Sequence, residues 1–459
     1  MIVRIRASRV FVGLCVMGVA MAAAPMSLAD EQPSAFVGVA KCEITPETPI
    51  EMYGYASRRT ESEGVAGRLK ATAVAIGKNG DLAGGAGPTV LLAVDNGSVP
   101  RAIRDEVYAR ISATHTIRPE RFVLCNAHNH SGPNLKGMAS IEGAHGEHLR
   151  QYAKLLTDRL ESVVLEALAS RKPGTLAWAQ GSVDFATNRR VLTDGRWSGF
   201  GAVPEGAVDH SLPVMRVADS EGRLMAIVVN YACHNTTLRG NFKQIHGDWA
   251  GCAQAAIERA HPGAVALITI GCGADSDPCP HGTTELCEQH GTAVAKEVSR
   301  LLKEENWTPL PGTITAKKRF LEVSYTEQKI DDESDRAVVV PSSSGGAPPR
   351  ETHDFETFQI TTWTFGDKLA MVFLSDEVVV DYALRLKQEM DGSRLWISAY
   401  SNDVSRYIVS KRLIAEGGYE VRNSLSTQLT FGSPEALAPA MEDRIVEAVK
   451  ELVPESFGR

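Results

Sequence analysis

The segment Asn126-Ala127-His128-Asn129-His130-Ser131-Gly132-Pro133 follows an apolar run, Arg121-Phe122-Val123-Leu124-Cys125, that is typical of a buried strand. The sequence Ser-Gly-Pro then breaks the strand. Residues two apart on an extended backbone point to the same side, so His128 and His130 are expected to face one point. Such a pair suits a metal ion together with a proton-transfer partner. Taken alone, the pair also fits two surface histidines at the end of a strand.

On both sides of this segment, short apolar runs alternate with helical patterns, which predicts an α/β fold of mixed β-sheets flanked by helices. Strands are expected at residues 35–40, 68–76, 89–94, 121–125, 174–179, 227–233, 265–270, 369–374 and 395–399. Helices are expected at residues 102–113, 148–170, 247–260, 284–305 and 434–452. A Gly-rich loop is predicted from about residue 191 to 209, and a long mobile loop from about 326 to 350.

The N-terminus has the pattern of a secretory signal peptide over residues 1–29, with three arginines before an apolar run and Ser27-Leu28-Ala29 at its end. We therefore expect a secreted or periplasmic protein with a single domain over residues 30–459. No later stretch reaches the roughly 20 apolar residues of a membrane span. The net charge of −8 and the absence of a dense Lys/Arg run exclude the usual signature of nucleic-acid binding.

Seven cysteines follow the signal segment, so at least one thiol is expected to stay unpaired. Cys279 and Cys287 flank a short Pro/His/Gly loop and are the best candidates for a disulfide. Cys125, Cys233 and Cys252 lie in or beside apolar segments and are interpreted as small buried side chains.

Polar residues that can bind a metal stand directly after five of the apolar strands. In open α/β sheets, ligands collect at the C-terminal ends of strands, so this repeated placement favours an enzyme. The residues in question are His128 and His130, then His234, Asp275, Glu377 and the segment 402–407.

Two histidines and one carboxylate make a hydrolytic zinc site that keeps a position open for water. Our ligand hypothesis is His128, His234 and Glu377. Zinc at such a site lowers the pKa of bound water to about 7 and polarises a carbonyl group. His130 is then a candidate acid or base, and Arg189 a candidate for oxyanion stabilisation.

Each of these residues has a simpler interpretation. His234 can cap a strand end, Glu377 can be a solvated turn carboxylate, and Arg189 with Arg190 can form a surface pair. His246 is a rival ligand because His246-Gly247-Asp248 precedes a predicted helix. A fourth ligand oxygen from Tyr407 does not follow from spacing, and that side chain can equally serve packing.

Other catalytic signatures are absent from the sequence. It has no Gly-x-Ser-x-Gly elbow, no phosphate-binding Gly-x-x-x-x-Gly-Lys-Ser/Thr loop, no Gly-x-Gly-x-x-Gly fingerprint and no His-Glu-x-x-His helix.

The chain resembles the neutral (non-lysosomal) ceramidase family of zinc amidases, from about Phe36 to Tyr419. The matching segments, in chain order, are Met52-Tyr53-Gly54-Tyr55-Ala56, His128-Asn129-His130-Ser131-Gly132-Pro133, Asn188-Arg189, Ala232-Cys233-His234-Asn235-Thr236, Glu377 and Asn402-Asp403-Val404-Ser405-Arg406-Tyr407. The resemblance implies a ceramidase-type catalytic fold, with the zinc ligands His128, His234, Glu377 and Tyr407. It also implies that His130 and Arg189 surround the scissile amide.

The sequence departs from the family pattern in two places. The family's Gly-Asp-Val-Ser-Pro segment, whose serine has a catalytic role, corresponds to Ala274-Asp275-Ser276-Asp277-Pro278. Asp277 aligns with the family's serine, and Ser276 precedes that position by one residue. Both are therefore catalytic candidates. The family's C-terminal β-sandwich is expected to be missing.

These observations predict a zinc-dependent amidohydrolase that cleaves the N-acyl bond of ceramide, yielding sphingosine and fatty acid. Its partner is then a small-molecule or lipid amide, met in transient contact with a membrane surface. Two rival hypotheses stay open: a metal-dependent amidase or esterase acting on another substrate, and a non-catalytic lipid- or glycan-binding relative.

Overall fold

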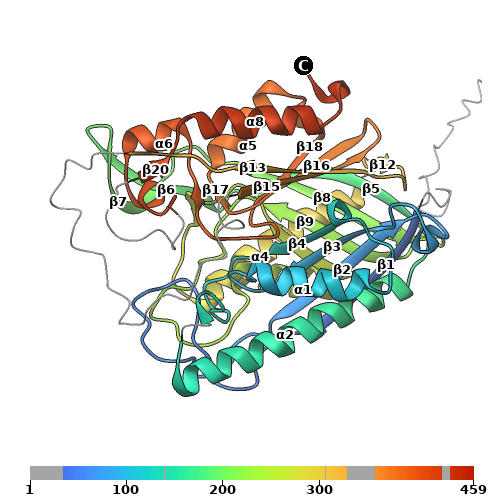
Figure 1. Cartoon of the computed structure of the whole chain (residues 1–459), viewed down its shortest axis with the longest axis horizontal. Coiled ribbons are helices and arrows are strands. Elements are labelled where there is room, and N and C mark those ends of the chain that lie inside the picture. The colour runs from blue at the N-terminus through green and yellow to red at the C-terminus, as the bar shows by residue number, and fades with distance from the viewer. Residues whose placement is uncertain (1–34, 139–140, 305, 328–356, 426–434) are drawn as a thin grey trace, which may run out of the picture.

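The computed structural model describes residues 35–138, 141–304, 306–327, 357–425 and 435–459, so the predicted signal peptide and most of the predicted long loop lie outside the described residues. Two β-sheets face each other in the middle of the molecule, and helices cover the outer face of each (Figure 1). The predicted α/β fold with mixed sheets is therefore confirmed.

The larger sheet has nine strands in the order β10-β9-β8-β5-β1-β2-β3-β4, with β12 paired to β5. Its pairs are antiparallel except β3 with β4 and β9 with β10, which are parallel. The strands are β1 (Ala35–Glu43), β2 (Lys70–Gly77), β3 (Thr89–Val94), β4 (Phe122–Asn126), β5 (Lys172–Ser182), β8 (Ser211–Asp219), β9 (Leu224–Tyr231), β10 (Val265–Ile270) and β12 (Thr308–Leu310).

The smaller sheet has four strands in the order β13-β15-β16-β18. They are β13 (Thr315–Glu322), β15 (Thr357–Phe365), β16 (Leu369–Leu374) and β18 (Leu395–Ser398). Short pairings complete the strand set: β6 (Ala186–Thr193) with β7 (Arg196–Val203) and β11 (Ser276–Pro278), β14 (Tyr325–Glu327) with β20 (Glu435–Leu437), and β17 (Glu377–Val378) with β19 (Tyr407–Ile408).

Three apolar cores hold the layers together. The core between the two sheets joins Trp178 and Leu267 of the larger sheet to Trp363, Phe373 and Trp396 of the smaller one. A second core packs α1 (Arg101–Ser112) and α2 (Gly143–Ala169) against β2, β3 and β4. The third contains side chains of α3 (Asp248–Ala260), α4 (Thr284–Lys303), α5 (Val380–Glu389) and α8 (Ala440–Leu452), with α6 (Lys411–Glu416) and α7 (Tyr419–Arg422) at its edge.

The structure corrects three expectations. The predicted Gly-rich loop is largely the β6–β7 hairpin, because β7 is mostly exposed and shows no buried stripe in the sequence. The last helix begins at Ala440, since residues 435–437 form β20 instead. Cys279 and Cys287 are not bonded to each other: all seven cysteines of the described residues are free, and Cys287 Sγ lies 3.6 Å from Asp248 Oδ1.

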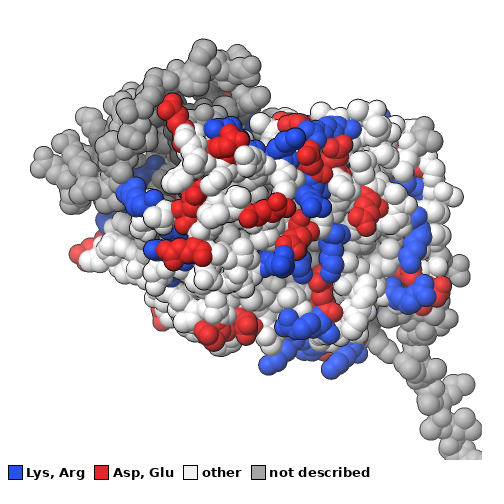
Figure 2. Space-filling model, turned by 90° about the horizontal axis from the view of Figure 1, so that it is seen from below, with Lys and Arg blue, Asp and Glu red and all other residues white. Residues whose placement is uncertain are grey.

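The surface carries both signs of charge. On the face seen in Figure 2, Lys and Arg side chains lie interspersed with Asp and Glu side chains. Within the described residues, no helix is both long enough and apolar enough to cross a membrane.

Candidate active site

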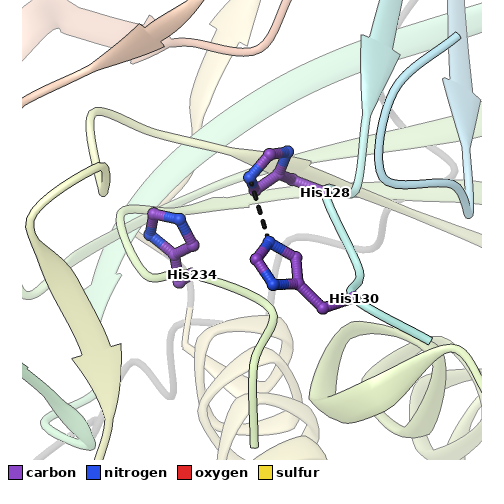
Figure 3. A group of neighbouring side chains, drawn as sticks. All are labelled: His128, His130 and His234. Carbon is purple, nitrogen blue, oxygen red and sulfur yellow. Dashed lines mark hydrogen bonds between the residues drawn. The ribbon is translucent and has the colours of Figure 1, made fainter. Parts of the chain in front are cut away.

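The two loops that follow β4 and β9 carry the three histidines of the site. Asn129 and Asn235 form an isolated parallel bridge between these loops, which brings His128 and His130 of the first loop next to His234 of the second (Figure 3). One ring nitrogen from each of the three histidines lies within 4.8 Å of the other two.

The route by which His128 and His130 meet differs from the expected extended backbone. His128 has a φ of 52°, a left-handed conformation that is uncommon outside glycine. The Nε2 atoms of the two rings nevertheless lie 3.4 Å apart. Asp376, Tyr400 and Asn402 also have positive φ angles, so backbone strain gathers around this site, as it does at many functional sites.

Glu377 reaches the histidines from the segment that follows β16. Its backbone pairs in parallel with Tyr407 through β17 and β19, which fixes these two predicted site residues side by side. The preceding Asp376 holds the partner segment, because its Oδ1 accepts hydrogen bonds from the backbone N–H groups of Ser405 and Arg406. Glu377 Oε2 lies 3.2 Å from His128 Nε2 and 3.4 Å from His234 Nε2.

The orientation of these two histidines is set by their other ring nitrogens. Nδ1 of His128 lies 2.8 Å from the carbonyl oxygen of Gly97, and Nδ1 of His234 lies 2.8 Å from that of Gly273. A carbonyl oxygen only accepts, so each Nδ1 carries a proton, and Nε2 of each ring faces Glu377. Glu377 Oε2 is buried without a hydrogen-bond partner among the described residues, so the two Nε2 atoms and this oxygen converge as the ligands of a cation would.

The donor set and its spacing fit zinc. Ligand bonds of about 2.0–2.1 Å in tetrahedral geometry separate ligand atoms by about 3.3 Å, close to the distances from Glu377 to the two rings. Carbonyl groups that orient metal-binding histidines are also the usual outer partners at such centres. Burial would raise the pKa of Glu377, but the adjacent His128 and His234 outweigh it and hold that pKa well below its ordinary value.

His130 is enclosed by the Met52–Ala56 segment. The rings of Tyr53 and Tyr55 lie edge-on to it at 5.5 and 5.1 Å. Gly54 has a φ of 96°, and a Cβ there would come within 2.2 Å of the His130 ring, so only glycine fits. Burial, followed by repulsion from His128 and His234, lowers the pKa of His130 well below its usual range.

Arg189 is buried and held by carboxylates on two sides. Its guanidinium lies 2.9 Å from Glu420 and 3.2 Å from Asp277, and Nη2 donates to the Tyr407 hydroxyl at 3.4 Å. Burial opposes the charge, but these neighbours outweigh it and raise the pKa of Arg189 well above its ordinary value. Nη1 lies 3.5 Å from His234 Nε2, so the cation stands beside the candidate metal ligands.

A cavity of about 480 Å³ opens beside this group. Its lining includes four of the eight predicted site residues, His130, Arg189, Asp277 and Tyr407. An apolar part of the lining includes Phe200, Ala202 and Tyr419. The cavity therefore reaches the groups that adjoin the candidate metal ligands.

Two predicted residues lie apart from this arrangement. His246 Nδ1 accepts a hydrogen bond from the backbone N–H of Asp248 at the start of α3, so His246 stabilises the helix end. Ser276 does not line the cavity, and its hydroxyl is buried without a hydrogen-bond partner among the described residues.

Sequence reasoning missed Glu420, Tyr419 and Tyr400. Glu420 is fully buried and pairs with both Arg189 and Arg190, although 231 positions separate it from Arg189. Tyr400 packs on the His128 ring at 4.4 Å. The positive φ of Tyr400 has no sequence signature in a non-glycine residue, and a contact across 231 positions leaves no local pattern.

Replacing Ser276 with alanine is expected to change kcat/KM less than about threefold, because the hydroxyl has no hydrogen-bond partner to lose among the described residues. Steady-state kinetics on the purified variant, with thermal unfolding as a control, test this. A hundredfold loss of kcat/KM at unchanged stability would instead assign the hydroxyl a catalytic role.

Comparisons with known proteins identify the family and the fold. The family model "Neutral/alkaline non-lysosomal ceramidase, N-terminal" matches residues 36–270, just over half of the chain. The fold is similar to the crystal structure of neutral ceramidase from Pseudomonas aeruginosa, with a TM-score of 0.70, 17% identity, and coverage of 92% of this chain and 74% of that one.

A second solved structure, a ceramidase complexed with C2, gives a TM-score of 0.69 at 17% identity, covering 92% of this chain and 76% of that one. No curated protein matches the sequence. At 17% identity the structural similarity establishes the fold alone. The match to the family model is a similarity in sequence. This chain belongs to the neutral/alkaline non-lysosomal ceramidase family.

Proposed function

We propose that this protein is a zinc-dependent amidohydrolase that cleaves the N-acyl bond of ceramide-like substrates, releasing a fatty acid and an amine such as sphingosine. The observation that carries the proposal is the convergence of His128 Nε2, His234 Nε2 and the otherwise unpartnered Glu377 Oε2 within the described part of the chain. Family membership supports the reaction class.

His128, His234 and Glu377 would hold the ion, with the Tyr407 hydroxyl as the fourth protein ligand because β17 and β19 place it beside Glu377. A zinc ion in this position supplies Lewis-acid activation of water and of the substrate carbonyl. Arg189 is oriented by Glu420 and Asp277, so its guanidinium is preorganised to stabilise negative charge on the carbonyl oxygen. His130, whose Nδ1 has no partner among the described residues, accepts a proton and passes it to the leaving amine.

Asp277 has a different role from a nucleophile in this proposal. Both of its carboxylate oxygens are engaged by arginines, at 3.2 Å from Arg189 and 3.1 Å from Arg239. We assign it the positioning of Arg189. The proposal also keeps residues 1–29 as a signal peptide, residues 30–459 as one catalytic domain, and a secreted or periplasmic location.

The decisive assay is release of fatty acid from an N-acylsphingosine by the mature chain, in three states: as purified, after chelation, and after zinc is restored. We expect chelation to lower the rate at least about a hundredfold and zinc to restore it, since the ion supplies several kcal/mol of transition-state stabilisation. Release that is insensitive to a chelator, from protein shown to be free of metal, would refute the proposal.

A further inference from the structure

A row of three charged side chains runs from the rim of the cavity to the candidate metal ligands. Arg239 Nη1 lies 3.1 Å from Asp277 Oδ2, and Asp277 Oδ1 lies 3.2 Å from Arg189 Nη1. Side-chain exposure falls along the row, from 31% for Arg239 to 15% for Asp277 and 9% for Arg189. Arg189 Nη1 then lies 3.5 Å from His234 Nε2, so the row connects the more exposed Arg239 to a candidate metal ligand.

The charges of this row do not balance on the side that faces the cavity. Among the described residues, its charged lining consists of two arginines and one aspartate. Arg189 has a second counter-charge, because it also pairs with the buried Glu420. Arg239 pairs with Asp277, its one carboxylate partner among the described residues. Arg239 therefore shares a single counter-charge with Arg189. Its guanidinium also hydrogen-bonds the Tyr55 side chain, and its remaining N–H groups can donate to a ligand.

The same cavity has an apolar part. The rings of Phe200 and Tyr419 lie 5.1 Å apart, and both side chains are more than one third exposed. They line the cavity together with Ala202. An acyl chain can bury apolar surface against these side chains, with a favourable free energy for each methylene group removed from water.

We propose that Arg239 is a carboxylate subsite, so that N-acyl amino acids are substrates alongside ceramide-like amides and are hydrolysed faster than uncharged N-acyl amines of the same acyl chain. The acyl chain packs on Phe200 and Tyr419, the amide lies at the centre formed by His128, His234 and Glu377, and the carboxylate binds Arg239. Hydrolysis adds one water: the C–N bond breaks, the acyl carbon gains the hydroxyl group, and the amino acid nitrogen gains the proton. The inference rests on the proposed amidohydrolase function and names its substrate class.

Electrostatics and geometry both favour an acid at this place. Guanidinium and carboxylate groups form paired, charge-assisted hydrogen bonds, which are about twice as strong as neutral ones. A neutral head group such as a hydroxyl offers weaker acceptors and leaves the surplus positive charge uncompensated. The preference is therefore set by Arg239, which stands at the rim, and not by the groups around the scissile bond.

The test compares N-dodecanoylglycine with N-dodecanoylethanolamine, which has the same chain and amide but no charge. Dodecanoate release is measured for the zinc-loaded wild type, Arg239→Gln and Arg239→Lys, with Arg223→Gln as a matched control on the distant β8–β9 turn. We expect the wild type to prefer the acid about tenfold in kcat/KM, and Arg239→Gln to lower that ratio about tenfold. Arg239→Lys keeps most of the preference because it keeps the charge, and Arg223→Gln keeps all of it.

Binding to metal-free protein supplies a second readout that does not depend on turnover. Calorimetry should show N-dodecanoylglycine binding about tenfold more weakly to Arg239→Gln than to the wild type or Arg223→Gln. An unchanged substrate ratio, or equal binding by wild type and Arg239→Gln, overturns the subsite. If wild type hydrolyses neither substrate nor N-acylsphingosine, the amidohydrolase proposal fails, and the binding result alone decides whether Arg239 holds carboxylates. If Arg239→Gln misfolds, the kcat/KM ratio of the two substrates in the wild type and in Arg239→Lys still tests the subsite.

Discussion

His234→Ala is expected to abolish stoichiometric zinc binding and to lower kcat/KM about a thousandfold or more. The substitution removes one of the three acceptor atoms that converge on the centre, and it also frees Arg189 from its contact with the ring. Loss of about 4 kcal/mol of transition-state stabilisation corresponds to a factor of about a thousand in rate. Metal analysis of the purified variant and kinetics at saturating zinc measure the two effects separately.

His246→Asn is the matched control for this experiment. Asparagine offers an oxygen in place of Nδ1, so the hydrogen bond from Asp248 N–H at the start of α3 is retained while the other ring nitrogen is removed. The variant should bind one zinc ion per chain. If His246→Asn lost zinc and His234→Ala kept it, His246 would be the metal ligand and His234 would not. That result would contradict the ligand set proposed above.

Glu420→Gln is expected to reduce both stability and turnover. The carboxylate is fully buried between Arg189 and Arg190, so its loss removes one counter-charge from each of these buried guanidinium groups. Asp277 still pairs with Arg189, and Glu416 still pairs with Arg190. We therefore expect the free energy of unfolding to fall by about 3 kcal/mol, the lower end of the range for a broken buried ion pair. Because Arg189 loses its orientation toward Tyr407 and His234, kcat should fall by about a hundredfold while KM changes little.

Glu416→Gln separates stability from catalysis in this cluster. Glu416 pairs with Arg190 and Arg412, and among the described residues it forms no ion pair with Arg189. Its replacement should therefore lower the unfolding temperature and leave kcat within about threefold. Thermal unfolding and single-turnover kinetics on both variants make the comparison. Equal loss of kcat in the two variants would mean that the cluster acts only through general stability.

The parts of the fold that could be predicted are those with an unbroken apolar run. The strands at 89–94, 265–270 and 369–374 begin and end where the sequence indicated, because strands buried on both faces contain little but apolar residues. The β6–β7 hairpin was not predicted, because β7 is mostly exposed and has no continuous run of apolar residues.

The site was predictable to the extent that its residues follow strands. His128, His234 and Glu377 meet as the strand-end argument expected, whereas the partners that orient them come from distant segments. Gly97 and Gly273 act through backbone carbonyl groups, which any residue has, and Glu420 reaches Arg189 across the chain. Residues that act through the backbone or across long separations leave no pattern in a single sequence.

The candidate ligands belong to opposite halves of the sandwich. His128 and His234 follow strands of the nine-stranded sheet, and Glu377 follows β16 of the four-stranded sheet. An ion held by all three is a cross-link between the sheets, so its binding free energy adds to the work needed to pull them apart. The linkage would be reciprocal. Loosening the apolar contact between the sheets at Trp396 would weaken the affinity for the ion, and a bound ion would protect that contact against proteolysis.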